Sequence, residues 1–356
     1  MWGDFTQIAN GPAIARRASA GGLVGTGLTM EGTNQNWPVY ELMLGNAHRS
    51  ETMTEGQIDG WLRSYAERRY GTAEATEAWK HFRRTAYATG LHSQMGHEPG
   101  LGYHAVDSIG GPHDDTYYSV VNGTTYRKPW YNLSDFAAGW GALLRAAAKT
   151  AQPLAPGLRH DLVDVTREAL VQYSDVLRNE LSLAVWKRDV SAARAIGAAI
   201  MELLADLDRI LASDEGFLLG SWLEDAKRAA GGDPEAQALY EWNARSQLTL
   251  YLRGVGTPDY SGTMDYAAKH WSGLVGTYYT ERWRLYLGMV DEAMAAGTDI
   301  NCTQFVARII GLTYTWMNST ELHANTTTGD ALSLSTAAYR KYMPLLPGVA
   351  AAAPVL

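Results

Sequence analysis

The stretch Thr54–Gly71, TEGQIDGWLRSYAERRYG, carries the signals of one complete amphipathic helix. Thr54 and Gln57 have the spacing of a capping box, in which each side chain satisfies a backbone N–H at the helix start. Gly71 stands where a left-handed C-cap is expected. Between these ends, apolar side chains recur on one face, at Ile58, Trp61, Leu62 and Tyr65. We therefore predict a helix from Thr54 to Tyr70.

The same helical period continues through most of the chain. A second helix is predicted over residues 73–89, and the pattern resumes at Ser134 after an irregular stretch, 90–132, that is rich in Gly, His, Asp and Tyr. Further helices are predicted at about residues 158–182, 188–212, 216–230, 234–250, 263–295, 302–319 and 330–342. No fixed-period repeat or long heptad pattern is present. The predicted fold class is mainly α, an irregular multi-helix domain.

The first fifty residues have a different pattern. The glycine-rich apolar run Gly21–Thr29 predicts a strand, and a helix is expected to begin at Trp37–Pro38. Glu31 follows the predicted strand directly, and catalytic groups of (β/α)8 enzymes project from such strand ends. On this pattern alone, a cap of the next turn or a solvated carboxylate is a better explanation of Glu31 than a catalytic role.

Composition excludes several classes of partner. The 356 residues carry a net charge of −8, so a phosphate-binding surface for nucleic acid is not expected. No apolar run reaches the roughly 18 residues of a membrane span, and the first residues lack the pattern of a signal peptide. The single cysteine, Cys302, excludes an internal disulfide. The sequence leaves the oligomeric state open.

Two features point toward secreted, sugar-related proteins. Five sequons for N-glycosylation are present, at Asn122, Asn132, Asn301, Asn318 and Asn325. Unless they arise by chance, they indicate a secreted or lysosomal/vacuolar parent protein. The chain has 12 Trp and 20 Tyr against 5 Phe. Aromatic rings with a polar tip suit stacking on sugars, and half-buried helices use them as well.

The segment GTGLTMEG (25–32) is followed by Gln35, Asn36 and Tyr40. This stretch resembles the part of the α-N-acetylglucosaminidase family of glycoside hydrolases that holds the nucleophile. Further resemblance lies in residues 68–71, 130–132, 161–167, 211–223, 243–250, 265–267 and 279–285. The resemblance covers roughly residues 20–345 and implies two parts: the last strand and helix of a (β/α)8 catalytic barrel (1–50) and an all-α C-terminal domain (51–345). Residues 346–356 are rich in Pro and Ala and have no amphipathic pattern, so a disordered tail is expected there.

The resemblance also implies a mechanism and site residues. Retaining glycosidases use two carboxylates, a nucleophile and an acid/base. Glu31 matches the nucleophile, and His97, Tyr251 and Tyr266 match substrate-binding positions, although the family has Trp where this chain has Tyr251. Helix-core packing is the alternative for both tyrosines. The resemblance implies no cofactor and no metal, and its substrate is a glycan with terminal α-linked N-acetylglucosamine, of heparan-sulfate type.

The family's acid/base glutamate lies in an Asn–Glu pair on an earlier barrel strand, and no such pair precedes Thr29 here. The chain is therefore expected to work with an upstream barrel domain of a parent protein, and to be a poor catalyst alone. The alternative is a non-catalytic helical carbohydrate-binding or interaction module.

Two remaining groups of polar residues are expected to have other roles. The stretch between His97 and Asp115 contains several His and Asp residues, but their spacing matches no metal-ligand template, and a solvated or substrate-lining loop is expected. Arg167 and Arg245 are predicted to be structural anchors that hold carboxylates or helix carbonyls.

Overall fold

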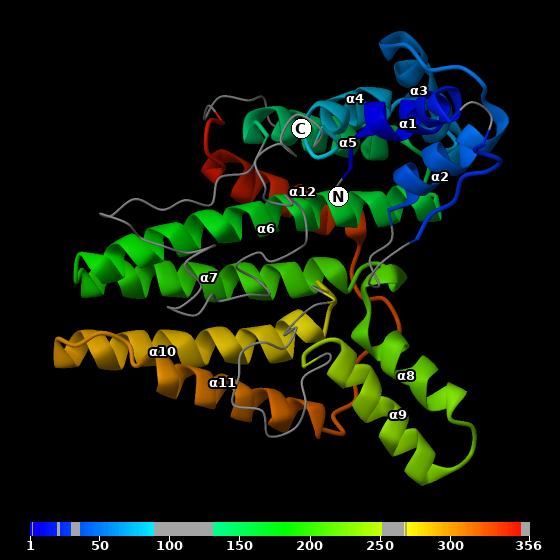
Figure 1. The fold of residues 1–356 in the computed structure, drawn as a ribbon. Coiled ribbons are helices and arrows are strands. Elements are labelled where there is room, and N and C mark those ends of the chain that lie inside the picture. Colours follow the sequence, from blue (N-terminus) through cyan, green and yellow to red (C-terminus); the bar gives the residue numbers. More distant parts are fainter. Residues whose placement is uncertain are drawn as a thin grey trace. The chain divides into compact units, whose positions relative to one another are not determined.

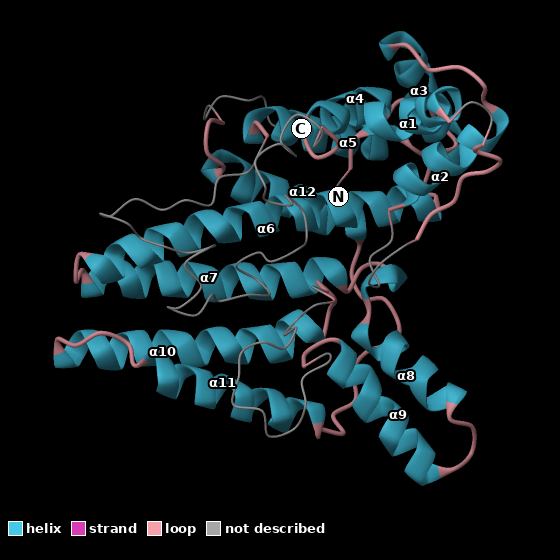
Figure 2. Ribbon diagram, viewed as in Figure 1, coloured by secondary structure: helices cyan, strands magenta, loops and turns pink. Residues whose placement is uncertain are grey.

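The computed structural model describes residues 1, 3–19, 22–29, 36–88, 131–250, 267 and 269–349. In these residues the regular structure is helical, as Figures 1 and 2 show, and extended pairing is limited to two isolated bridges, Asp4 with Ala88 and Leu218 with Ser272. The mainly α fold class is confirmed. The chain forms two compact units, and helix α6 (Pro156–Trp186) contributes to both.

The first unit comprises the described parts of Met1–Leu101, Pro129–Ala169 and Ala331–Leu356. In it, α4 packs along α5, and α5 also contacts α12. Its helices are α1 (Phe5–Ala18), α2 (Trp37–Gly45), the 3-10 turn η1 (Asn46–His48), α3 (Glu55–Tyr70), α4 (Thr76–Arg84), α5 (Leu133–Lys149), α12 (Ala331–Tyr342) and the 3-10 turn η6 (Met343–Leu345).

The second unit comprises the described residues of Leu170–Asp330. Within it, α10 packs on α7 and on α11, and α8 pairs with α9 as a helical hairpin (Figure 1). Its elements after α6 are α7 (Val190–Leu211), the 3-10 turn η4 (Glu215–Phe217), α8 (Leu219–Ala229), α9 (Pro234–Gln247), the π-helical turn η5 (Leu274–Tyr279), α10 (Thr280–Ala296) and α11 (Cys302–Met317).

The strand predicted over Gly21–Thr29 is wrong for its described part. Residues 22–29 have no regular structure, and the Val24 side chain is 98% exposed. A barrel strand obtains its backbone hydrogen bonds from neighbouring strands, and no described segment pairs with this one. Apolar composition alone therefore does not make a strand here.

Helix α1 was not predicted from the sequence. It begins at an Asp4 N-cap, whose carboxylate accepts from Gln7 N at 2.8 Å, and it includes the buried Pro12. Gly11 and Pro12 are poor helix residues in an interior position, which conceals the helical pattern. Tertiary burial of Phe5 and Ala9 compensates for that weak propensity.

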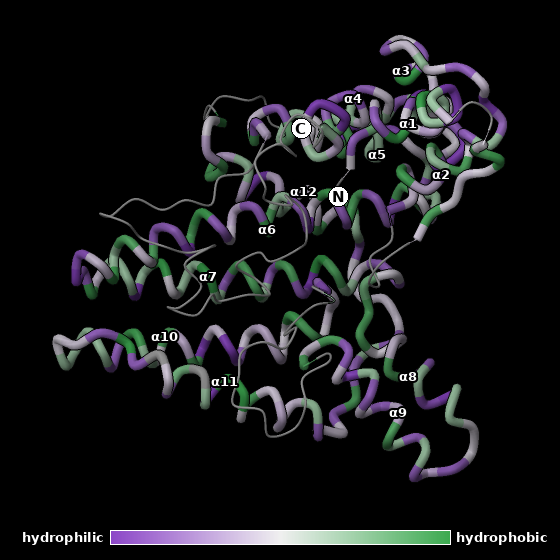
Figure 3. The backbone as a smooth tube through the Cα atoms, in the orientation of Figure 1, coloured by the Kyte–Doolittle hydropathy of each residue, from purple (hydrophilic) through white to green (hydrophobic). Residues whose placement is uncertain are grey.

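Most other predicted helices are confirmed within a few residues. The capping box of Thr54 with Gln57 and the left-handed Gly71 are both present at the ends of α3. The helix predicted from residue 263 is corrected: among the described residues, helical structure begins only at Leu274, because Gly273 has φ +91° and interrupts the backbone. Figure 3 shows polar and apolar residues alternating along α7, as expected for a helix with one buried face.

Large aromatic side chains form the core of the first unit. Phe5 stacks on Tyr87 with ring centroids 4.4 Å apart, Tyr65 meets Trp79 edge-on at 5.1 Å, and Trp140 meets Tyr339 at 4.9 Å. These rings are buried. Packing thus explains a large part of the Trp and Tyr usage. No helix in the described ranges has the length and apolarity to cross a bilayer.

Two glycines let α5 approach its neighbours closely. A Cβ atom at Gly139 would lie 2.8 Å from both His81 Cβ and a Phe82 ring carbon of α4. A Cβ at Gly141 would lie 2.6 Å from the Tyr339 hydroxyl of α12. Distances this short exclude a side chain unless the helices separate.

We predict that Gly139→Ala destabilises the protein by about 1–3 kcal/mol, because overpacking outweighs the helix propensity gained. The matched control is Gly60→Ala on α3, where no atom lies within 4 Å of the added Cβ. That change should stabilise by roughly 0.5–1 kcal/mol. Urea unfolding of both variants measures the difference, and equal stabilities would contradict the close approach.

Candidate functional site

The four predicted site residues, Glu31, His97, Tyr251 and Tyr266, all lie outside the described residues. The structure describes segments that adjoin Glu31 and the two tyrosines. Asn36 and α2 follow Glu31 in the first unit, and α9 and η5 flank the segment with both tyrosines in the second unit.

Two contacts fix the start of α2. The Tyr87 hydroxyl donates to Asn36 Oδ1 at 3.0 Å. The Arg69 guanidinium lies over the Trp37 ring, 5.7 Å from its centroid, in a cation–π contact. Asn36 and Trp37 are therefore held by Arg69 of α3 and by Tyr87, which follows α4.

Arg69 is itself held by a buried polar network. Its Nε and Nη2 donate to the two carboxylate oxygens of Asp161 at 2.6 and 2.7 Å. Tyr70 donates to the same carboxylate at 2.6 Å, and Trp79 Nε1 donates to the Tyr70 hydroxyl at 2.9 Å. The bidentate geometry sets the plane of the guanidinium, and with it the face presented to Trp37.

The protonation states in this network are those that the hydrogen bonds require. Burial, followed by the Asp161 charge, raises the pKa of the Tyr70 hydroxyl well above its usual value, so that Tyr70 remains a donor. Burial opposes the charge on Arg69, but hydrogen bonding to Asp161 prevails and raises the pKa of Arg69. Arg69 and Tyr70 therefore both keep the protons that they donate across the physiological pH range.

A small cavity lies beside this network, with Asn36, Trp37, Tyr87, His160 and Asp161 in its wall. It has room for about one water molecule. A sugar does not fit. The network is thus a support for the start of α2 and not a substrate pocket.

Both predicted arginine anchors are confirmed. Arg167 donates to Asp164 at 2.8 Å in the first unit. In the second unit Arg245 is fully buried and donates to the Glu241 carboxylate from Nε and Nη2, at 3.1 and 2.8 Å. Its Nη2 also donates to the Glu321 carbonyl at 2.9 Å.

Sequence analysis gave no role to Asp161, Tyr70 or Trp79. A signal was available, since Arg69 and Asp161 both lie in motifs that carry the family resemblance and have complementary charges. Nothing in the sequence pairs Arg69 with Asp161, because 92 residues separate them. Only the packing of α3 on α6 within the first unit brings the pair together.

We predict that Arg69→Lys destabilises the protein by about 1–3 kcal/mol, because a lysine cannot make the bidentate contact and leaves buried acceptor capacity unused. The adjacent Arg68, which pairs with Glu41 at the surface, supplies the control. Arg68→Lys should change stability by less than about 0.5 kcal/mol. Chemical denaturation reports both values, and similar losses would argue against a special role for Arg69.

His323, near Arg245 in the second unit, should contribute a pH dependence. Burial and then the Arg245 charge lower the pKa of His323, and Glu321 and Glu241 oppose this. The ordinary pKa of a histidine is about 6.5. At pH values near and below it, the unfolded chain binds more protons at His323 than the folded chain does. The free energy of unfolding therefore falls as the pH falls toward the pKa of His323 in the folded protein.

We predict that His323→Gln reduces the loss of Tm between about pH 7.5 and 5.5 relative to the unsubstituted chain. His48→Gln, at an exposed position, serves as the control and should leave the slope unchanged. Differential scanning fluorimetry across this range measures the slopes. An unchanged slope in His323→Gln would show that this imidazole titrates alike in both states.

In the comparison with known proteins, two family models match successive parts of the chain. The family model described as alpha-N-acetylglucosaminidase (NAGLU) C-terminal domain matches residues 61–341, and the one described as alpha-N-acetylglucosaminidase (NAGLU) tim-barrel domain matches residues 1–50. Human alpha-N-acetylglucosaminidase is 33% identical over 347 residues. That alignment covers 97% of this chain and 43% of the human protein, so the chain spans less than half the length of this relative.

Solved structures show the same fold. A family 89 glycoside hydrolase from Clostridium perfringens in complex with PUGNAc gives a TM-score of 0.79 at 22% identity, over 96% of this chain and 37% of that chain. The enzyme from the same organism in complex with its substrate, GlcNAc-alpha-1,4-galactose, gives 0.81 at 22% identity, over 97% and 38%.

Proposed function

The chain belongs to the alpha-N-acetylglucosaminidase family of glycoside hydrolases, and on that premise we propose that it is the C-terminal part of a retaining enzyme. The enzyme would hydrolyse terminal α-linked N-acetylglucosamine from glycans of heparan-sulfate type. The observation that carries this proposal is the match of two family models in the expected order over residues 1–50 and 61–341. We keep residue 50 as the boundary between the barrel part and the all-α domain.

Glu31 is the proposed nucleophile. In double displacement it attacks the anomeric carbon, and the second carboxylate, an acid/base glutamate on another barrel strand, protonates the leaving oxygen and then activates water. A nucleophile needs a fixed position relative to the sugar ring. The Asp161–Arg69–Trp37 chain of contacts supports this requirement, because it holds Trp37, six residues beyond Glu31.

The exposed face of α2 supports an adjoining barrel. This helix, WPVYELMLG, has one charged residue, and a helix that is apolar all round is normally buried. Trp37 and Leu44 are nevertheless 45% and 54% exposed, and Ile14 of α1 is 55% exposed. We propose that the other strands and helices of the (β/α)8 barrel cover these side chains.

The remaining assignments extend the same proposal. His97, Tyr251 and Tyr266 would contact the N-acetylglucosamine ring, with the tyrosines stacking on it or hydrogen-bonding its hydroxyls. The parent protein would be secreted or lysosomal/vacuolar. Four sequon asparagines are exposed and accessible to a glycan: Asn132, Asn301, Asn318 and Asn325.

The test is hydrolysis of an aryl α-N-acetylglucosaminide by the native polypeptide that contains these residues. Glu31→Gln should reduce kcat at least about 10³-fold, because the nucleophile is lost. The control, Glu51→Gln, removes an exposed carboxylate that pairs with Arg17 and should leave the rate unchanged.

Equal rates for Glu31→Gln and Glu51→Gln would remove Glu31 from the mechanism. Binding of N-acetylglucosamine by the native polypeptide without any hydrolysis would favour the non-catalytic carbohydrate-binding module instead. Calorimetric titration with N-acetylglucosamine, run beside the rate assay, separates these outcomes.

A further inference from the structure

We propose that the turn between α6 and α7 is a glycan-binding surface. The exposed indole of Trp186 would stack on a sugar ring there, while Lys187 would pair with an acidic group of the same oligosaccharide. The class of ligand, an acidic oligosaccharide of heparan-sulfate type, rests on the proposed function. All residues of this surface are described and belong to the second unit.

Trp186 presents its ring to solvent. It is the last residue of α6 and is 56% exposed, whereas Trp140 and Trp283 are buried in the core. Within the described ranges, no other aromatic ring and no cation lies against the Trp186 ring. An indole has a large apolar face and one polar N–H, so it suits a ligand that also combines an apolar face with polar edges. A pyranose ring has this character.

The turn after Trp186 contains a strained arginine. Arg188 N donates to the Val185 carbonyl at 3.0 Å, and Asp189 N donates to the Ala184 carbonyl at 2.9 Å. This is the hydrogen-bond pattern of a Schellman motif, whose left-handed position is ordinarily a glycine. Arg188 occupies that position with φ +58°. A left-handed non-glycine residue costs free energy, which points to a role for its side chain.

The Arg188 side chain ties the turn to the residues that follow α10. Its Nη1 donates to the Thr298 carbonyl, and its Nη2 donates to Asp299 Oδ1 at 2.6 Å. On the other side of the turn, Asp189 Oδ1 caps α7 by accepting from Ala192 N at 2.9 Å. The backbone that carries Trp186 is therefore fixed before a ligand binds, which lowers the entropy cost of binding.

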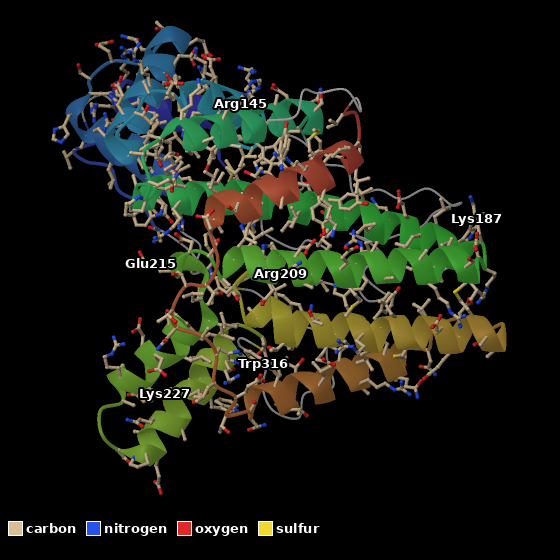
Figure 4. The ribbon with its side chains drawn as sticks, turned by 180° about the vertical axis from the view of Figure 1, so that it is seen from behind. Arg145, Lys187, Arg209, Glu215, Lys227 and Trp316 are labelled. Carbon is tan, nitrogen blue, oxygen red and sulfur yellow. The ribbon has the colours of Figure 1, made fainter. Side chains whose placement is uncertain are left out.

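The charges around the ring favour an acidic ligand. Lys187, labelled in Figure 4, is exposed and makes no ion pair with any residue that the structure describes. The charge of Arg188 is matched by Asp299, and the Asp189 carboxylate is engaged as a helix cap. Lys187 is thus left to pair with a carboxylate or a sulfate group beside the sugar that stacks on Trp186.

The surroundings of the ring favour a glycan over a protein partner. A specific protein interface buries about 800 Å² on each partner around an apolar centre. The three residues after Trp186 are instead charged and exposed, namely Lys187, Arg188 and Asp189. One aromatic ring with a charged rim has the size to cover a single sugar ring.

The test is calorimetric titration of the native polypeptide with a heparan-sulfate oligosaccharide that ends in a uronic acid, which the proposed hydrolysis cannot consume. Trp186→Ala should weaken binding at least about tenfold, as expected for loss of a tryptophan anchor. Lys187→Gln should weaken it about threefold at low salt and reduce its salt dependence. The matched control is Tyr240→Ala, which removes a 43% exposed aromatic ring of α9 and should leave the affinity unchanged.

Turnover gives a second readout. In Trp186→Ala, kcat and KM for a small aryl α-N-acetylglucosaminide should be unchanged, whereas KM for a heparan-sulfate oligosaccharide with terminal α-N-acetylglucosamine should rise about tenfold. If the unsubstituted protein does not hydrolyse the aryl glycoside, the proposed function fails, and the titration still decides whether Trp186 binds the oligosaccharide.

Three results of the titration would overturn the proposal: no binding by the unsubstituted protein, equal affinity in Trp186→Ala, or an equal loss in Tyr240→Ala. Sedimentation velocity of the same variants tests the protein alternative. Loss of an oligomer in Trp186→Ala without a change in oligosaccharide affinity would show that the ring is a protein contact.

Discussion

An arginine that donates to a carboxylate from two of its nitrogens is the interaction on which both units depend next to the proposed site segments; Arg245 is fully buried and Arg69 is partly buried. In the first unit Arg69 holds Asp161 and faces Trp37. In the second, Arg245 holds Glu241 and faces Trp316. In each case the planar cation joins a helix, a distant acceptor and an indole ring. The Arg69–Asp161 pair joins two nitrogens to two oxygens, and this bidentate geometry fixes orientation as well as distance; both Arg245 nitrogens donate to the same Glu241 oxygen.

The helical domain was predictable because its signals are local. The capping box at Thr54, the left-handed Gly71 and the apolar period between them specify α3 without any tertiary information. Gly21–Thr29 and α1 were not predictable in this way. A strand over Gly21–Thr29 would need neighbouring strands for its backbone hydrogen bonds. Pro12 weakens the helical pattern of α1 in the sequence, and the burial of Phe5 compensates for it. The roles of Arg69 and Asp161 escaped sequence analysis because only packing pairs them.

What the structure describes of the proposed site is the set of residues near the proposed nucleophile and the two tyrosines. Glu31, His97, Tyr251 and Tyr266 remain predictions from family resemblance, whereas Asn36 and Trp37 after Glu31, and Thr249 before Tyr251, have observed contacts. Part of the high Trp and Tyr content is explained by the core, where rings such as those of Trp79 and Trp140 are buried. The exposed side chains of Trp37 and Leu44 on α2 agree with the proposed barrel cover.

The central claim, that Glu31 forms a covalent bond to the sugar, can be tested by trapping the intermediate. The native polypeptide would be acid-quenched during turnover of an aryl α-N-acetylglucosaminide, digested with pepsin, and its peptides mapped by mass spectrometry. The account predicts an N-acetylhexosamine adduct on the peptide that contains Glu31, with retention of the anomeric configuration in the product. An adduct on another carboxylate, or release of the inverted anomer first, would contradict it.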